Sequence, residues 1–258
     1  MAGDFLINVN GFSLFKAKFM LSSEKLLCWI FRVQETTLRH NKAKKIIVFS
    51  DYLKSRYLKT TQENKLRVIP IGVDFPSIES KQVNDIIHIG FIAKDFESKG
   101  GEYLLEAYKE AYKSNQKMKL TIIGTSPKIS EKECQEYNIE WINLVPRDQL
   151  FTEYFPSFDV FAYPTLADGL PLVVLEALSF SIPILTSDIL ALPEMIGYGE
   201  AGEVTQSKDV KSIRTALNKM TNSDYIIRKK DAVNQFFRRK YWSSVTNDQL
   251  KKVYEECL

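Results

Sequence analysis

The chain has 258 residues, of which 45% are hydrophobic and 26% charged, so it can form a folded core and is not a disordered chain. Its formal net charge of +3 is uneven, because residues 1–74 carry 13 Lys and Arg against six Asp and Glu. These basic residues are scattered, without zinc-ligand spacing or an aromatic RNA-binding motif, which excludes nucleic acid as the expected partner. Aromatic and aliphatic residues lie among them between Phe15 and Val33, which leaves peripheral membrane contact open.

The sequence gives little indication of a metal site, a disulfide framework or a membrane-spanning segment. The three cysteines, Cys28, Cys134 and Cys257, are far apart and form no CxxC pair, and His40 and His88 are the only histidines. No run reaches the roughly 18 uncharged apolar residues that span a bilayer. The N-terminal residues also lack the pattern of a secretory signal. We therefore expect a cytoplasmic protein without a metal or other cofactor.

Short apolar runs alternate with amphipathic segments along the chain, as strands and crossover helices do in a parallel sheet. In the first part, a helix at residues 51–59, capped by Ser50 or Asp51, separates strands at 46–50 and 66–71. Later strands are expected at residues 86–92, 119–123, 141–144, 160–163 and 182–185. Later helices are expected at residues 101–113, 147–155, 172–180 and 210–220. The predicted fold class is α/β, a Rossmann-like parallel sheet with helices on both faces, whose ligands bind beyond the carboxyl ends of the strands.

Two lysines lie in the loop AKDFESKGG, which follows the strand at 86–92 and leads into the next helix. Lys94 and Lys99 bring positive charge there, and the glycine pair opens a helix whose free N–H groups and dipole favour an anion. The pattern is that of a phosphate site. Lysines of a polar loop are also commonly just solvated, and the loop by itself does not decide between the two interpretations.

A second loop, TLADGLPL, follows the strand at 160–163 and places two carboxylates around an apolar helix. Gly169 permits close backbone approach, and Pro171 suits a first helical turn. Asp168 and the nearby backbone can hydrogen-bond to sugar hydroxyls, and Glu176 can accept both hydroxyls of a ribose. The competing interpretations are that Asp168 caps the helix and that Glu176 lies at the solvent edge.

A third loop, VPRDQL, follows the strand expected at 141–144. The backbone of Val145 can border a nucleobase. For the side chains the favoured interpretation is a simple turn in which Asp148 caps the following helix.

Together these segments resemble the retaining glycosyltransferases of family 4, also called glycosyl transferase group 1. Ala93–Gly101, AKDFESKGG, is similar to the family segment GRDFERKGG. Asp168–Glu194, DGLPLVVLEALSFSIPILTSDILALPE, is similar to EGLPLVLLEAMACGLPVIATDVGGIPE. Ile69–Asp74, IPIGVD, mirrors the linker IPNGVD, and Gly199–Val204, GEAGEV, resembles the turn DGETGLLV.

The resemblance implies the donor-binding half of a GT-B enzyme, which transfers a sugar from a nucleotide sugar to a glycan or lipid acceptor with retention. The family's paired glutamates fall on Asp168 and Glu176, which implies that Asp168 contacts the transferred sugar and Glu176 the ribose. Lys99 and Lys94 fall on the family's diphosphate-binding lysine and arginine. The implied donor-binding backbone is that of Val145, Gly169, Leu170, Pro171 and Leu172.

The resemblance also implies a division of the chain and some departures from the family. Residues 1–72 are expected to be a reduced acceptor domain, 73–220 the nucleotide-sugar domain, and 221–258 closing helices that pack back toward the first part. Asp168 is one methylene shorter than the usual Glu, Lys94 replaces an Arg, and Ala93 replaces a Gly.

Because little acceptor domain precedes the linker, several alternatives to a complete hexosyltransferase stay open. We expect self-association or a partner chain over the exposed interdomain face. The second hypothesis is a nucleotide-sugar-binding subunit or a noncatalytic module that needs a partner chain. A nucleotide-sugar epimerase is less favoured, and a dinucleotide oxidoreductase least, because no strand is followed by GxGxxG.

Overall fold

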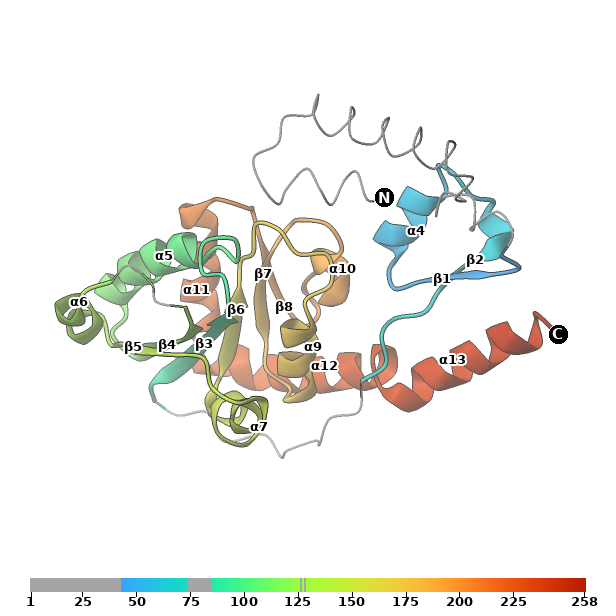
Figure 1. Cartoon of the computed structure of the whole chain (residues 1–258). Helices are drawn as coiled ribbons and strands as arrows, with labels where there is room; N and C mark the ends of the chain where they lie inside the picture. The colour runs from blue at the N-terminus through green and yellow to red at the C-terminus, as the bar shows by residue number, and fades with distance from the viewer. Residues whose placement is uncertain (1–42, 74–84, 126, 128) are drawn as a thin grey trace, which may run out of the picture.

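The computed structural model describes residues 43–73, 85–125, 127 and 129–258. The predicted membrane-contact segment from Phe15 to Val33, together with Cys28 and His40, lies outside these residues. Most of the described chain forms a six-stranded sheet of order β5-β4-β3-β6-β7-β8, in which every neighbouring pair is parallel. Figure 1 shows this sheet with helices on both sides, as the α/β pattern predicts.

The four inner strands of the sheet are almost entirely buried, as expected when both faces of a parallel sheet are covered, whereas the edge strands β5 and β8 are partly exposed. Their bounds are β3 (Ile87–Ala93), β4 (Met118–Gly124), β5 (Ile139–Ile142), β6 (Val160–Tyr163), β7 (Ile184–Ser187) and β8 (Gly202–Thr205). Strand β6 has the predicted bounds, whereas β5 and β7 are each displaced by two residues. Strand β8 was not predicted, because GEAGEV was assigned to a turn and its apolar signal is a single valine between polar residues.

Two apolar clusters lie on the two faces of the sheet. One face is covered by α5 (Gly101–Ser114), α6 (Glu131–Glu136) and α11 (Val210–Met220). The other is covered by the helical turn η2 (Leu150–Tyr154), which follows α7 (Arg147–Gln149), and by α8 (Phe155–Ser157), α9 (Leu172–Ser179) and α10 (Leu192–Met195). Helix α12 (Ser223–Lys240) joins the two layers, because Ile226 packs in the first cluster and Phe237 in the second.

Residues 43–73 form a separate small unit, visible beside the main sheet in Figure 1. It consists of β1 (Ile46–Val48), α4 (Asp51–Tyr57) and β2 (Leu66–Val68), with the two strands paired in parallel. Ser50 caps α4 as predicted, since its Oγ accepts a hydrogen bond from the Leu53 N–H over 3.1 Å.

Side chains from the large unit hold this small unit in place. The Glu194 carboxylate of α10 accepts hydrogen bonds from the backbone N–H groups of Asp51 and Tyr52, at 2.9 and 3.1 Å. Helix α13 (Ser243–Glu255) runs beneath β1 and β2 in Figure 1, and Glu256 just after it pairs with Lys45 and Arg67. The division into units at residues 72 and 220 stays a prediction.

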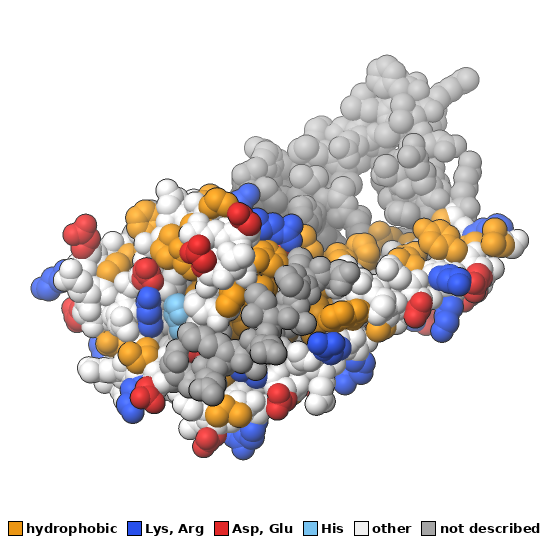
Figure 2. All heavy atoms as spheres, turned by 90° about the horizontal axis from the view of Figure 1, so that it is seen from below, with side chains coloured by type: hydrophobic (Ala, Val, Ile, Leu, Met, Phe, Trp, Pro, Cys, Tyr) orange, Lys and Arg blue, Asp and Glu red, His pale blue; other side chains and the backbone are white. Residues whose placement is uncertain are grey.

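The surface gives two further observations. Within the described residues, no helix is both long enough and apolar enough to cross a membrane. On the face shown in Figure 2, acidic and basic side chains are interspersed rather than gathered by sign.

Candidate functional site

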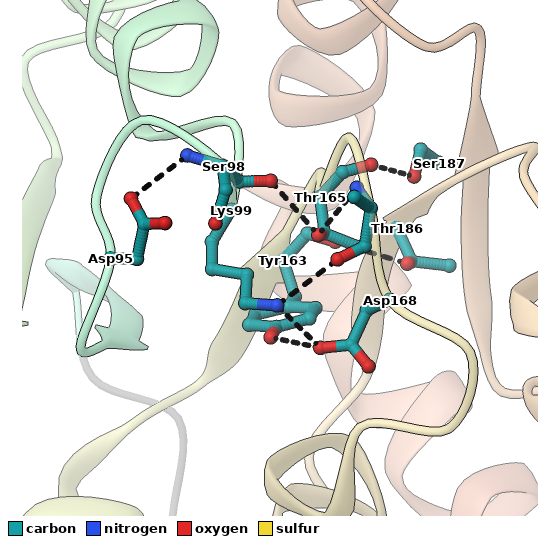
Figure 3. A network of polar contacts seen from close by, with 9 residues as sticks. Asp95, Ser98, Lys99, Tyr163, Thr165, Asp168, Thr186 and Ser187 are labelled. Atoms are coloured by element: carbon teal, nitrogen blue, oxygen red, sulfur yellow. Dashed lines mark hydrogen bonds and ion pairs between the residues drawn. The ribbon is translucent and has the colours of Figure 1, made fainter. Parts of the chain in front are cut away.

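Two loops meet at the carboxyl ends of β3 and β6, which are neighbours in the sheet. The Ser98 carbonyl of the first loop accepts hydrogen bonds from the Leu166 N–H (2.9 Å) and the Thr165 hydroxyl (3.2 Å) of the second (Figure 3). Gly100 permits this approach, because its φ is +75° and a Cβ there would lie 1.9 Å from the Pro164 carbonyl oxygen. The loop that carries the predicted lysines is therefore held against the loop that carries Asp168.

Lys99 and Asp168, which are 69 positions apart in sequence, form an ion pair at this junction. The Lys99 Nζ lies 2.8 Å from Asp168 Oδ2 and also donates to the Ala167 carbonyl over 3.1 Å. Both side chains are about one-fifth exposed, which leaves them within reach of a ligand. The cap interpretation of Asp168 is wrong, because Pro171 is the N-cap of α9 and no side chain caps that helix.

The absence of a side-chain cap on α9 also has an electrostatic consequence. The N–H groups of the first turn of a helix have no partner within the helix, and the helix dipole makes this end positive. In α9 this end follows directly on the loop of Asp168 and Gly169. A Cβ added at Gly169 would meet nothing within 4 Å, so there is open space beside it.

Glu176 is buried on α9, with a relative exposure of 9%, so the solvent-edge interpretation is wrong. Burial raises the pKa of its carboxyl group, and the neighbouring Arg147 opposes that rise. The Arg147 Nη2 lies 2.8 Å from Glu176 Oε1, and its guanidinium lies over the Phe151 ring at 5.2 Å. The prediction that Asp148 caps the helix after VPRDQL is also wrong, because the N-cap of α7 is Pro146 and no side chain caps it.

Lys94 takes no part in the Lys99–Asp168 contact or the Arg147–Glu176 contact. No hydrogen bond or ion pair joins it to Lys99, Asp168 or Glu176, all of which the structure describes. Its side chain lines a 540 Å³ surface pocket beside α5, together with Asp95, Phe96, Glu97, Glu102, Leu105, Glu106, Lys109 and Thr125. That pocket includes none of the other predicted charged residues. Of the four, the structure joins two by a direct contact, Lys99 and Asp168, whereas Glu176 pairs with Arg147.

The predicted backbone positions differ in exposure. Gly169 and Leu172 are exposed, Val145 and Leu170 are partly buried, and Pro171 is buried. Among the described residues, no three His, Cys, Asp or Glu side chains group as metal ligands would. The expectation that no metal is used stays a prediction.

Two side chains of the site were not predicted from the sequence. Tyr163 donates a hydrogen bond from its hydroxyl to Asp168 Oδ2 over 2.9 Å, and Arg147 is the partner of Glu176. The sequence predicts Tyr163 only as the last residue of the strand at 160–163, and it favours a simple turn for the side chains of the loop that contains Arg147. A signal was present for Arg147, because a buried carboxylate requires a cation or a donor nearby.

The order of this parallel sheet is that of a Rossmann-like fold, and solved structures of GT-B glycosyltransferases share the fold of this chain. TarM shares it with a TM-score of 0.66 at 17% identity, over 83% of this chain and 44% of TarM. HepE of Anabaena, solved with UDP and glucose, shares it with a TM-score of 0.64 at 13% identity, over 85% of this chain and 66% of HepE. At such identities the likeness shows the fold alone.

The sequence matches the family model "Glycosyl transferases group 1" over residues 77–235, and the chain belongs to that family. It is 24% identical to the capsular polysaccharide biosynthesis glycosyltransferase CapM of Staphylococcus aureus, over 83% of this chain and 62% of CapM. It is 28% identical to an MMP alpha-(1->4)-mannosyltransferase of Mycolicibacterium hassiacum, over 75% of this chain and 49% of that protein. The chain thus spans less than two thirds of the length of these relatives.

Proposed function

We propose that this chain binds a nucleotide diphosphate sugar and acts as a family 4 glycosyltransferase that moves a hexose to a glycan or lipid acceptor of the cell envelope, with retention. The observation that supports this most is the Lys99–Asp168 ion pair at the open N-terminal end of α9. A cation, a carboxylate and unpaired helix N–H groups in one place match a ligand that carries both a diphosphate and sugar hydroxyls.

Each part of the donor has a proposed partner. The diphosphate lies between Lys99 and the first turn of α9, with Lys94 approaching from the same loop as Lys99. Asp168 and the backbone of Gly169, Leu170, Pro171 and Leu172 contact the transferred sugar. Glu176 accepts hydroxyls of the ribose, and the backbone of Val145 borders the base.

The proposed mechanism is electrostatic. As the bond to the leaving diphosphate breaks, negative charge grows on the phosphate oxygens and positive charge on the sugar ring. Lys99 and the N–H groups of α9 are fixed in advance where the negative charge develops, and such preorganised donors are worth about 3–4 kcal/mol each in known active sites. Asp168 stabilises the positive sugar from the other side. This division of charge needs no metal ion and no nucleophilic side chain.

The acceptor class and the setting rest on the relatives. CapM is named for capsular polysaccharide biosynthesis, and two other relatives are named as an O-antigen chain mannosyltransferase and an exopolysaccharide phosphotransferase. An envelope glycan or its lipid-linked precursor is therefore the proposed acceptor. The proposed place of action is the cytoplasm or the cytoplasmic membrane surface, because nucleotide sugars and lipid-linked intermediates meet there.

Calorimetry with UDP, GDP, ADP and their glucose or mannose conjugates tests donor binding. We expect one nucleotide to bind, and Lys99→Ala and Glu176→Ala each to weaken it by about 1–3 kcal/mol, because each removes a charged hydrogen-bond partner. Lys109→Ala is the matched control, since this lysine pairs with Glu133 on α5 and α6. Donor binding is refuted if no nucleotide binds or if all three variants bind alike.

A second assay separates transfer from binding. The purified chain is incubated with the bound nucleotide sugar and simple acceptors, and NMR of the product reports the anomeric configuration. Transfer with retention supports the proposal. Binding without transfer or hydrolysis would favour the binding-subunit alternative instead.

A further inference from the structure

Tyr163 is a buried residue at the end of β6 whose hydroxyl reaches out to the proposed site. Its side chain is 3% exposed, and its ring stacks on Phe161 at a centroid distance of 6.1 Å and lies against Phe91 at 6.5 Å. Its carbonyl accepts a hydrogen bond from the Thr186 hydroxyl over 3.0 Å. The ring is thus fixed from several sides, and the position of its hydroxyl is fixed with it.

Among the residues that the structure describes, the hydroxyl of Tyr163 donates to one acceptor, the carboxylate of Asp168. Its oxygen lies 2.9 Å from Asp168 Oδ2, which is also the atom that receives Lys99 (Figure 3). Burial raises the pKa of Tyr163, and the nearby charge of Asp168 raises it further, so the phenol keeps its proton and remains a donor. A hydrogen bond to a charged acceptor is stronger than one between neutral groups.

Both donors on Asp168 use the same oxygen. Within the described residues Oδ1 receives no hydrogen bond, and the side chain is 21% exposed. Two donors on Oδ2 fix the rotation of the carboxylate, and Oδ1 is then directed to the partly open side. A short aspartate arm that must meet a sugar hydroxyl gains from such fixation, because fewer rotamers have to be lost on binding.

The two donors have different expected fates when a ligand enters. Lys99 carries the charge that a diphosphate attracts, and it extends from a loop. Tyr163 is neutral and held in the core, so a diphosphate gives it no reason to move. An arriving diphosphate therefore draws Lys99 from Asp168, whereas the phenol remains.

We propose that Tyr163 is a positioning residue, whose hydroxyl holds Asp168 so that its second carboxylate oxygen meets the transferred sugar while Lys99 engages the diphosphate. This inference rests on the proposed donor-binding function. Asp168 is one methylene shorter than the usual Glu, and Tyr163 is the residue that holds this shorter carboxylate in the orientation that reaches the sugar.

Calorimetry on wild type and Tyr163→Phe tests the role. The probes are UDP, GDP and ADP, and the conjugates UDP-glucose, GDP-mannose and ADP-glucose. One nucleoside diphosphate and its sugar conjugate are expected to bind the wild type. For these two compounds, Tyr163→Phe should weaken the binding of the nucleotide sugar 3- to 10-fold and change the affinity of the nucleoside diphosphate less than 2-fold. The reason is that Asp168 faces only the sugar. Adding Tyr163→Phe to Asp168→Asn should cause less than a 2-fold further loss.

Tyr108→Phe is the matched control, because this buried tyrosine also donates from its hydroxyl, to the Tyr137 carbonyl, and packs in the cluster around α5. It should leave both affinities unchanged. Thermal unfolding of both variants separates lost stability from lost positioning. Should Tyr163→Phe fail to fold, Lys99→Ala gives the second measurement, because the Tyr163 hydroxyl is then the donor that remains on Asp168 Oδ2. In Lys99→Ala the ratio of nucleotide-sugar affinity to nucleoside-diphosphate affinity should stay within 2-fold of the wild-type ratio, and a larger fall would overturn the positioning role.

The outcomes are distinct. A wild-type chain that binds none of the six compounds overturns the proposed function and the role of Tyr163 together. If wild type binds a nucleotide sugar and Tyr163→Phe binds it equally well, the positioning role alone is wrong. The same holds if Tyr163→Phe weakens the nucleotide sugar and the nucleoside diphosphate in equal proportion, because that is the result of a merely structural role.

Discussion

His88 gives a prediction of acid sensitivity whose size follows from the structure. It lies on β3, with Nδ1 3.1 Å from the Ser157 carbonyl oxygen and Nε2 2.7 Å from the Thr121 hydroxyl. A neutral imidazole fits both contacts, with Nδ1–H donating to the carbonyl and Nε2 accepting from the Thr121 hydroxyl, in competition with Glu140, whose Oε2 lies 3.3 Å from the same hydroxyl. The pKa of His88 is lowered to about 4, chiefly by burial and next by the charge of Lys119, against the opposing effects of the Ser157 carbonyl, Asp159 and Glu140.

The sign and size of the effect follow from proton linkage. In the unfolded chain the imidazole titrates near pH 6.5, so below that pH the unfolded state takes up the proton first and the folded state loses stability. The stability is complete above pH 6.5 and falls as the pH drops toward 4. At pH 4.5 the loss amounts to about 2.5 kcal/mol, because each unit of pKa difference is worth about 1.4 kcal/mol.

Urea unfolding followed by tryptophan fluorescence, at pH 7.5 and pH 4.5, measures this loss. His88→Gln keeps a donor and an acceptor but does not titrate, so the difference in unfolding free energy between wild type and the variant should shrink by about 2.5 kcal/mol at pH 4.5. Carboxylates that titrate in the same range cancel in this difference. Stability curves that run parallel from pH 7.5 to 4.5 would refute the reasoning.

Three other predictions concern the site and its supports. Arg147→Met removes the cation that lowers the pKa of Glu176, so this pKa should rise and nucleotide affinity, measured by calorimetry, should decline at a higher pH than in wild type. Glu194→Gln leaves one acceptor oxygen for two N–H groups at the start of α4, and urea unfolding should show a loss of about 1–2 kcal/mol. Gly100→Ala forces a Cβ against a carbonyl oxygen at positive φ, and should cost more than about 2 kcal/mol by the same method, whereas Gly169→Ala has open space and should be nearly neutral.

A different result would contradict each of these three predictions. Unchanged pH dependence in Arg147→Met would mean that the ion pair with Glu176 does not control its ionisation. Glu200→Gln is the control for Glu194→Gln, because Glu200 pairs with Arg239 at the surface and should contribute less than about 1 kcal/mol. Equal losses in the two glutamine variants would show that the contact with α4 is not special. Equal stability of the two alanine variants at Gly100 and Gly169 would refute the loop-approach argument.

The fold was largely predictable because the apolar residues of most helices and strands recur with a clear helical or strand period. Strand β6 and helix α11 have the predicted bounds. Strand β7 begins two residues late because Ile182 belongs to the turn after α9, where its N–H bonds to the Ala177 carbonyl. Strand β5 begins two residues early, because Ile139 pairs with Leu120 of β4. The apolar run alone does not predict which residue of the neighbouring strand each of its residues pairs with.

The site was predictable only in part. The motif led to Lys99, Asp168 and Glu176, but the partners Tyr163 and Arg147 depend on the direction of side chains from a strand and a loop that meet only in three dimensions. Sequence spacing predicts the position of a hydrogen-bond donor or acceptor on a helix, strand or loop. It does not say which neighbour satisfies that group once the core is packed.

A crystal structure of the chain with the nucleotide that calorimetry identifies tests the central claim most directly. The account predicts the diphosphate within hydrogen-bond distance of Lys99 Nζ and the first-turn N–H groups of α9, with a ribose hydroxyl on Glu176. A nucleotide in the 540 Å³ pocket beside α5, with its diphosphate between Lys94 and Lys109, would contradict it.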